Sequence, residues 1–368
     1  MKLRYKIANG LIITLVLATV SLALVLSHSS DCEPVPALSD ETTAMKAIVG
    51  QCYGSPDVLE FADIAKPVPA DNEVLVKIHA ASVNPLDWHF MRGTPYIVRL
   101  FSGLGTPDDP GVGVDFSGTV EAVGRDVTRY KVGDEVFGGG SGAFAQYLLK
   151  EEDSHSFVAK PDNVSHEQAA AVPIAGLTAL QALRDSGKLK AGEKVLINGA
   201  SGGVGTLAVQ IAKSLGAEVT GVCSTRNLEM VRSIGADHII DYKKDNYTEK
   251  GQQYDLIIDM VGNHSISDNR KALKPKGRMV MVGGGKGNWI APFLGSIEAA
   301  LWAPFIDQEI GTMLSEFSSD DLTTLGELMR TGEMDPVIGS RFELAETAEA
   351  IRHSEQGHAR GKIIIEIP

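Results

Sequence analysis

The chain has 368 residues, of which 43% are hydrophobic, and these values predict two folded domains rather than a disordered chain. Its net charge of −13 repels phosphate backbones and argues against nucleic acid as a partner. The three cysteines, Cys32, Cys52 and Cys223, form no CxxC pair and are too sparse for a disulfide framework. No Cys/His group has the spacing of zinc ligands, so we expect no bound metal.

The first 30 residues combine a basic start with an apolar run over 11–26, and no Asp, Glu, Lys or Arg occurs from Ile7 to Ser30. This pattern predicts a single-pass membrane anchor over residues 1–30; export after cleavage of a signal peptide is one alternative, and a buried N-terminal helix is another. Basic residues before the run and acidic residues after it favour a cytoplasmic N-terminus. Residues 31–44, rich in Pro, Ser, Thr and acids, predict a linker.

Residues 45–166 have the pattern of a β-rich domain. Apolar and polar residues alternate at its start, and several short apolar runs are closed by glycines. The expected strands are 45–54, 73–84, 115–124 and 132–139. The tail, 335–368, shows two similar strands around a helix, so we expect it to rejoin this domain.

Between residues 167 and 334 the pattern changes to alternating strands and helices. The expected strands are 194–199, 218–224, 238–242, 254–262 and 277–285, and the expected helices are 165–183, 203–216, 227–235 and 266–274. Continuous β-branched runs between helices are typical of strands that are covered on both faces. The sequence therefore predicts an α/β fold, in which a doubly wound, mostly parallel sheet is inserted in the β-rich domain.

The glycine-rich stretch "NGASGGVG" (198–205) joins an expected strand to an expected helix. A helix N-terminus offers free N–H groups and partial positive charge, and glycine lets the backbone approach a ligand closely. The strict GxGxxG spacing is absent, but a glycine turn at this place in a βαβ unit is typical of a dinucleotide pyrophosphate site.

The end of the next strand, "CSTRN" (223–227), indicates which dinucleotide binds. A site for NAD usually places Asp or Glu about 20 residues after the glycines, where the carboxylate holds the ribose 2′-OH. This chain has Ser224, Thr225 and Arg226 instead, and hydroxyls with a guanidinium suit a 2′-phosphate. The sequence therefore favours NADPH.

These residues resemble a known family, the zinc-free medium-chain dehydrogenase/reductases of the quinone oxidoreductase (zeta-crystallin-like) group. The resemblance covers about residues 45–368. It rests on "ASVNPLDWHFMRG" (81–93), "PGVGVDFSGTVEAVG" (110–124), "VGDEVFG" (132–138), "AAAVPIAGLTALQAL" (169–183), "NGASGGVG" (198–205) and "GADHIIDY" (235–242). Zinc-dependent relatives carry a cysteine near Asn84 and Gly-His-Glu near Gly113-Val114-Asp115, and both sets are missing here.

The resemblance implies a GroES-like catalytic domain over 45–166, completed by 335–368, and an NADPH-binding Rossmann domain over 167–334. It places the active site in the cleft between them. The residues that it assigns to the cofactor, from the pyrophosphate through the 2′-phosphate to the nicotinamide end, are Ser201, Gly202, Gly203 and Val204, then Ser224, Arg226 and Tyr242, then Asn84, Thr178, Val282 and Gly283. Homodimers are common among such relatives.

The resemblance does not carry over a proton donor, because His89 stands where many quinone oxidoreductases have a tyrosine. His89 and Tyr96 are the candidate catalytic residues, and water is the alternative donor. The sequence thus predicts a metal-independent reductase that transfers hydride from NADPH to a lipophilic quinone or α,β-unsaturated carbonyl. Two alternatives stay open: a membrane-tethered NADPH-binding protein that acts through a partner, and a zinc alcohol dehydrogenase.

Overall fold

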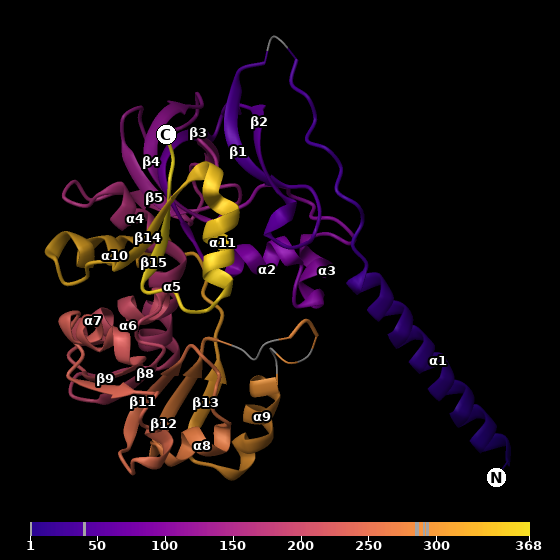
Figure 1. Cartoon of the computed structure of the whole chain (residues 1–368), viewed down its shortest axis with the longest axis vertical. Coiled ribbons are helices and arrows are strands. Elements are labelled where there is room, and N and C mark those ends of the chain that lie inside the picture. Colours follow the sequence, from indigo (N-terminus) through magenta and orange to yellow (C-terminus); the bar gives the residue numbers. More distant parts are fainter. Residues whose placement is uncertain (1, 40–41, 284–286, 290, 292–293) are drawn as a thin grey trace.

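The structure is a computed structural model that describes residues 2–39, 42–283, 287–289, 291 and 294–368. Helix α1 (Lys2–Ser27) projects away from the rest of the molecule (Figure 1). None of the described helices is both long and apolar enough to cross a membrane, which takes about 20 consecutive apolar residues. The expectation of a single-pass anchor over residues 1–30, and of a membrane location, is therefore wrong.

The expected linker is covalently tied to the rest of the chain. Residues 30–39 form no helix or strand, yet Cys32 forms a disulfide with Cys52, their Cα atoms being 4.8 Å apart. We expected no disulfide framework from such sparse cysteines; this single bond was not anticipated, because folding brings together two cysteines whose spacing in the sequence carries no signal. Cys223 is the free, buried thiol among the described residues.

Two sheets with antiparallel pairs build the β-rich part. A two-stranded sheet holds β1 (Ala44–Gly50) and β2 (Leu59–Ala65). The described strands of the larger sheet run in the order β14-β15-β3-β4-β5-β7, and β6 also pairs with β3. Their bounds are β3 Glu73–Val83, β4 Asp115–Val123, β5 Glu135–Gly139, β6 Tyr147–Glu151, β7 Phe157–Ala159, β14 Ile338–Glu343 and β15 Lys362–Glu366. The chain thus leaves this sheet after β7 and returns to it at β14.

The remaining described strands form a six-stranded sheet in which every neighbouring pair is parallel. Its order is β10-β9-β8-β11-β12-β13, and the bounds are β8 Lys194–Asn198, β9 Glu218–Cys223, β10 His238–Asp241, β11 Tyr254–Asp259, β12 Leu273–Met281 and β13 Glu309–Thr312. Along β8, Val195 and Ile197 join one apolar core while Leu196 joins another. Alternate side chains point to opposite faces, so both faces are buried and the predicted doubly wound sheet is confirmed.

Helices pack beside both sheets (Figure 1). The longer ones are α2 (Pro85–Arg92), α5 (Pro173–Gln181), α6 (Gly203–Ser214), α9 (Leu294–Trp302), α10 (Ser319–Thr331) and α11 (Thr347–Glu355), and the shorter ones are α3 (Arg99–Ser102), α4 (His166–Ala170), α7 (Leu228–Ser233) and α8 (Ile266–Lys271). A π-helical turn spans Ala182–Ser186, and 3₁₀ turns span Pro56–Val58, Tyr96–Val98, Thr225–Asn227, Tyr247–Glu249, Ala303–Phe305 and Leu344–Glu346.

Candidate functional site

The parallel sheet has one point at which its strand order reverses. From β8 the chain moves outward through β9 and β10, and it then returns to the other side of β8 with β11, β12 and β13. In open α/β sheets, ligands bind in the crevice beyond the carboxyl ends of the strands at such a switch point. Here β8 ends at Asn198, whose Nδ2 donates to Oδ1 of Asp259 at the end of β11, at 2.9 Å. The loop that follows Asn198 is the predicted glycine loop.

The glycine loop has the backbone that a pyrophosphate site needs. Gly199 adopts φ +94°, which favours glycine, and a Cβ on Gly205 would lie 2.1 Å from the carbonyl oxygen of Gly199. A Cβ on Gly202 would instead meet only that oxygen, at 3.6 Å. Helix α6 begins at Gly203, so the N–H groups of its first turn, which includes Val204, lack partners within the helix. These groups fit the pyrophosphate of a dinucleotide.

The predicted 2′-phosphate residues follow the ends of β9 and β10. Ser224 is buried, and its Oγ accepts a hydrogen bond from Asn227 Nδ2 at 3.3 Å. Arg226 is exposed, and its Nη2 donates to the carbonyl oxygen of His358 at 2.7 Å. Tyr242 is half exposed, and its N–H donates to the Cys223 carbonyl oxygen at 3.1 Å, which holds the two strand ends together.

Three of the four predicted nicotinamide residues lie after β12 and in α5. Val282 and Gly283 follow β12, and their N–H groups both donate to the Asp259 carbonyl oxygen; a Cβ on Gly283 would lie 2.3 Å from the Met260 carbonyl oxygen. Thr178 of α5 is buried, and its Oγ1 lies 3.0 Å from Ser315 Oγ. Val282 and Gly283 therefore share the switch-point edge with the glycine loop.

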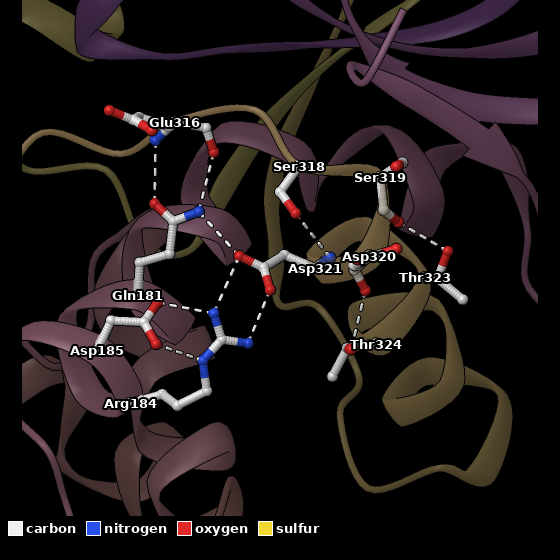
Figure 2. A network of polar contacts seen from close by, with 10 residues as sticks. All are labelled: Gln181, Arg184, Asp185, Glu316, Ser318, Ser319, Asp320, Asp321, Thr323 and Thr324. Carbon is white, nitrogen blue, oxygen red and sulfur yellow. Dashed lines mark hydrogen bonds and ion pairs between the residues drawn. The ribbon is translucent and has the colours of Figure 1, made fainter. Parts of the chain in front are cut away.

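Figure 2 shows how the segment after β13 is held against α5 and the π-helical turn. Gln181 exchanges hydrogen bonds with the backbone of Glu316, and it also donates to Asp321 at 2.9 Å. Arg184 reaches both oxygens of Asp321, and Ser318 caps the start of α10 by accepting from the Asp321 N–H. The network holds Glu316 against α5, and the neighbouring Ser315 is the partner of Thr178.

A buried polar cluster, which the sequence analysis missed, meets the glycine loop from the other sheet. Lys362, the first residue of β15, is 3% exposed, and its Nζ lies 2.6 Å from Asn84 Oδ1 and 3.4 Å from Asp115 Oδ2. Asn84 Nδ2 in turn donates to Asp115 at 2.8 Å. The Lys362 side chain would lie 3.0 Å from a Cβ on Gly203, and Gly361 N–H donates to Ser201 O at 2.9 Å. Burial lowers the pKa of Lys362, and Asp115 opposes this shift.

Asp87, which follows Asn84 by one turn, is a second buried group of this cluster. Its Oδ2 accepts the Asn84 N–H at 2.6 Å, and its buried Oδ1 has no hydrogen-bond partner among the described residues. Burial raises the pKa of Asp87 to about 8, and the nearby Asp115 adds to the shift while the Asn84 N–H and Lys362 oppose it. The carboxyl is therefore largely protonated at neutral pH.

The two candidate catalytic residues differ in what they can donate. His89 Nδ1 lies 2.7 Å from the Thr94 carbonyl oxygen, and because a carbonyl only accepts, Nδ1 carries the proton and Nε2 is an acceptor. Burial lowers the pKa of His89, which favours this neutral form. Tyr96 begins the 3₁₀ turn after α2; its N–H donates to the Asn288 carbonyl oxygen at 2.8 Å, and its ring meets Trp289 edge-on at 4.7 Å.

Comparisons with known proteins agree with this architecture. The sequence matches "Alcohol dehydrogenase GroES-like domain" over residues 70–162 and "Zinc-binding dehydrogenase" over residues 234–365. It is 34% identical over 338 residues to the quinone oxidoreductase of Homo sapiens, covering 87% of this chain and 97% of the human protein. The chain belongs to the quinone oxidoreductase group of the medium-chain dehydrogenase/reductase superfamily.

Other members of the group and related structures are similarly close. A chloroplast envelope quinone oxidoreductase homolog of Arabidopsis thaliana is 33% identical over 344 residues, covering 88% of this chain and 98% of the plant protein. The quinone oxidoreductase structure from Coxiella burnetii superposes with a TM-score of 0.78 at 31% identity, over 89% of this chain and 100% of the bacterial one. The CurK enoyl reductase structure gives 0.75 at 25% identity, over 88% and 99% of the two chains. This quinone oxidoreductase homologue is an oxidoreductase that uses a nicotinamide cofactor.

A pair of glycine variants separates the two tasks of the glycine loop. We expect Gly205→Ala to lower the free energy of unfolding by about 2 kcal/mol, because its Cβ would overlap the Gly199 carbonyl. Gly202→Ala has room in the fold and should cost less than about 1 kcal/mol, yet it should weaken cofactor binding about tenfold by filling the pyrophosphate space. Urea unfolding and fluorescence titration with NADPH measure the two effects. Unchanged NADPH affinity in Gly202→Ala would show that the glycine loop does not bind the cofactor.

Asp87 should make stability fall as pH rises. The folded chain holds a proton that the unfolded carboxyl releases above about pH 4, so the free energy of unfolding declines up to the folded pKa of about 8. Asp87→Asn cannot ionise and should flatten this decline by up to about 1 kcal/mol per pH unit. Urea unfolding of both proteins between about pH 5 and about pH 8 measures the slopes. Equal slopes would show that Asp87 ionises normally in the folded chain.

Proposed function

We propose that this protein is an NADPH-dependent, metal-independent reductase that transfers hydride to a quinone or an α,β-unsaturated carbonyl. The observation that carries the cofactor choice is the end of β9, where Ser224 and the exposed Arg226 stand in place of a carboxylate. A guanidinium binds a 2′-phosphate strongly, whereas a carboxylate at this point would repel it. Tyr242, which directly follows β10, would add a side chain to the same subsite, because its N–H bond to Cys223 keeps it beside the end of β9.

The acceptor class follows from how its developing charge is stabilised. Reduction of a quinone or an enone delocalises negative charge onto an oxygen, which hydrogen bonds can hold. Asn84 and Asp115 stand near the positions where zinc-dependent relatives have metal ligands. Here both side chains are engaged with Lys362, and no three His, Cys, Asp or Glu side chains of the described residues converge as metal ligands. The relatives named for quinone and enoyl reduction support the same acceptor class.

Each part of the site has a separate task in this mechanism. When bound, the reduced nicotinamide supplies the hydride. The loop over Ser201 to Val204 would hold the pyrophosphate, while Asn84, Thr178 and the Val282–Gly283 turn, held by the contacts described above, would orient the nicotinamide end. Of the two candidate proton donors, we assign Tyr96, because its hydroxyl donates in the neutral form while His89 already gives its N–H to Thr94.

The decisive experiment follows the loss of absorbance of the reduced nicotinamide with the full-length protein. Quinones and enones serve as acceptors, a saturated ketone serves as the control acceptor, and NADPH and NADH are compared. We expect turnover of quinones or enones with NADPH, and little with the ketone. Tight binding of NADPH without turnover of any acceptor would contradict the reductase and favour a binding protein.

Arg226 should decide between the two nicotinamide cofactors. Arg226→Gln removes a charged hydrogen bond to the 2′-phosphate, worth about 1.5–3 kcal/mol, so the Kd for NADPH should rise about 10- to 100-fold. The Kd for NADH should stay unchanged, because NADH has no 2′-phosphate. Arg232→Gln, at an exposed arginine of the next helix, is the matched control. An equal change for both cofactors would show that Arg226 does not read the 2′-phosphate.

A further inference from the structure

The segment from His28 to Cys32 precedes the region that resembles the family, yet it is built into the catalytic part of the molecule. Ser30 N–H donates to the Gly105 carbonyl oxygen at 2.9 Å, and Ser29 forms a parallel bridge with Gly105. Two residues later, Cys32 is bonded to Cys52, which follows β1. We call residues 28–32 the leader strap. It is held by backbone pairing at one end and by a covalent bond at the other.

The leader strap also provides ligands for a buried arginine. Arg99 is 3% exposed, and its Nη1 and Nη2 donate to the His28 carbonyl oxygen at 2.6 Å and to Ser29 Oγ at 3.1 Å. Its Nε donates to the Gly93 carbonyl oxygen at 2.9 Å, and Nη2 also reaches the Arg92 carbonyl oxygen at 3.3 Å. Within the described residues no carboxylate pairs with Arg99. The buried cation therefore depends on these oxygens, and the strap supplies two of the four.

Two tyrosine rings complete the environment of Arg99. Its guanidinium lies 4.4 Å from the centroid of the Tyr53 ring and 4.9 Å from that of Tyr96. Such contacts attract a cation and gain strength where water is excluded. Gly93 makes the approach possible, because a Cβ there would lie 2.5 Å from Arg99 Nε and 2.7 Å from the Tyr53 ring. Arg99 thus fixes the position of the Tyr96 ring relative to the strap.

Tyr96 extends this arrangement to the other part of the molecule. Its N–H donates to Asn288, and its ring contacts Trp289, in the segment that follows the Val282–Gly283 turn. On the other side, Thr94, two residues before Tyr96, accepts from His89 of α2. Tyr96 therefore lies where the catalytic part meets the segment leading away from the expected nicotinamide end.

We propose that Arg99 is a positioning residue of the acceptor side of the site, and that the leader strap, locked by the Cys32–Cys52 disulfide, is the part of the chain that holds it in place. Through Arg99 the strap fixes Tyr96 against Trp289. The inference rests on the proposed reductase function, because its kinetic consequence concerns the acceptor. The hydrogen bonds of the strap among the described residues run to α1, Arg99 and Gly105 rather than to the glycine loop, so NADPH binding should be independent of the strap.

The kinetic test uses the full-length protein with NADPH and the best acceptor from the panel. Arg99→Met should raise the acceptor KM about fivefold, while the Kd for NADPH stays unchanged. Arg99→Lys keeps the charge but loses the planar fork, so its acceptor KM should lie between those of the wild type and Arg99→Met. Arg125→Gln, at a largely exposed arginine paired with Asp71, is the control and should keep the wild-type KM. A merely structural defect would instead lower the amount of active protein and leave the acceptor KM unchanged.

A second test removes the disulfide and leaves Arg99 intact. Cys52→Ser, and wild-type protein treated with dithiothreitol, should both raise the acceptor KM about twofold, and dithiothreitol should add nothing to the variant. Wild-type acceptor KM in Cys52→Ser and in both Arg99 variants would overturn the proposal.

A readout without turnover separates this inference from the proposed function. Backbone hydrogen exchange of residues 93–105 should become faster in Cys52→Ser and in Arg99→Lys, because the Tyr96 N–H loses its fixed position against Asn288. If the wild-type protein reduces no acceptor, the reductase proposal fails, and the exchange result still decides the role of the strap. Unchanged exchange over 93–105 in both variants would overturn that role.

Discussion

A buried lysine sets the geometry on which the site depends. The ammonium of Lys362 is almost fully removed from water, and a buried cation is tolerated only where oxygens and an opposite charge surround it. Asn84 and Asp115 supply these, from the start of α2 and the start of β4. Because β15 belongs to the tail, this interaction joins three distant parts of the chain directly behind the glycine loop.

A backbone contact beside Lys362 holds the glycine loop against the tail. Gly361 donates to Ser201 and bridges Gly202, so the backbone of the parallel-sheet part is hydrogen-bonded to the residue just before β15. Gly203 faces the Lys362 side chain at a distance that leaves little room for a Cβ. The loop is therefore shaped on one side by its own strand and on the other by the tail, and its open side is the one that a dinucleotide would fill.

The sequence predicted the features that local chemistry determines. Glycines between a β-branched strand and an amphipathic helix predict a tight turn into the helix, so the position of the loop and the parallel sheet could be predicted. The continuous helix expected over 165–183 is divided instead, because Pro173 starts a new helix and cannot continue the old one. Lys362 and Asn84 are 278 residues apart, and Cys32 and Cys52 are joined across a loop with no spacing signal, so neither contact could be read from the sequence. The anchor expected over 1–30 and the linker expected over 31–44 likewise gave no sign of the strap.

Helix α2 shows how these constraints combine at the site. Its start is fixed by Asn84, which Lys362 holds, and its last carbonyls, those of Arg92 and Gly93, are bonded to Arg99. A cation at a helix C-terminus is favourable, because the unpaired carbonyls carry partial negative charge. The lysine places one ammonium among oxygens, whereas the planar arginine fork reaches three carbonyls and one hydroxyl through three separate nitrogens. The helix that carries His89 is thus held between two buried cations, Lys362, which belongs to the tail, and Arg99, which is bound in part by the leader strap.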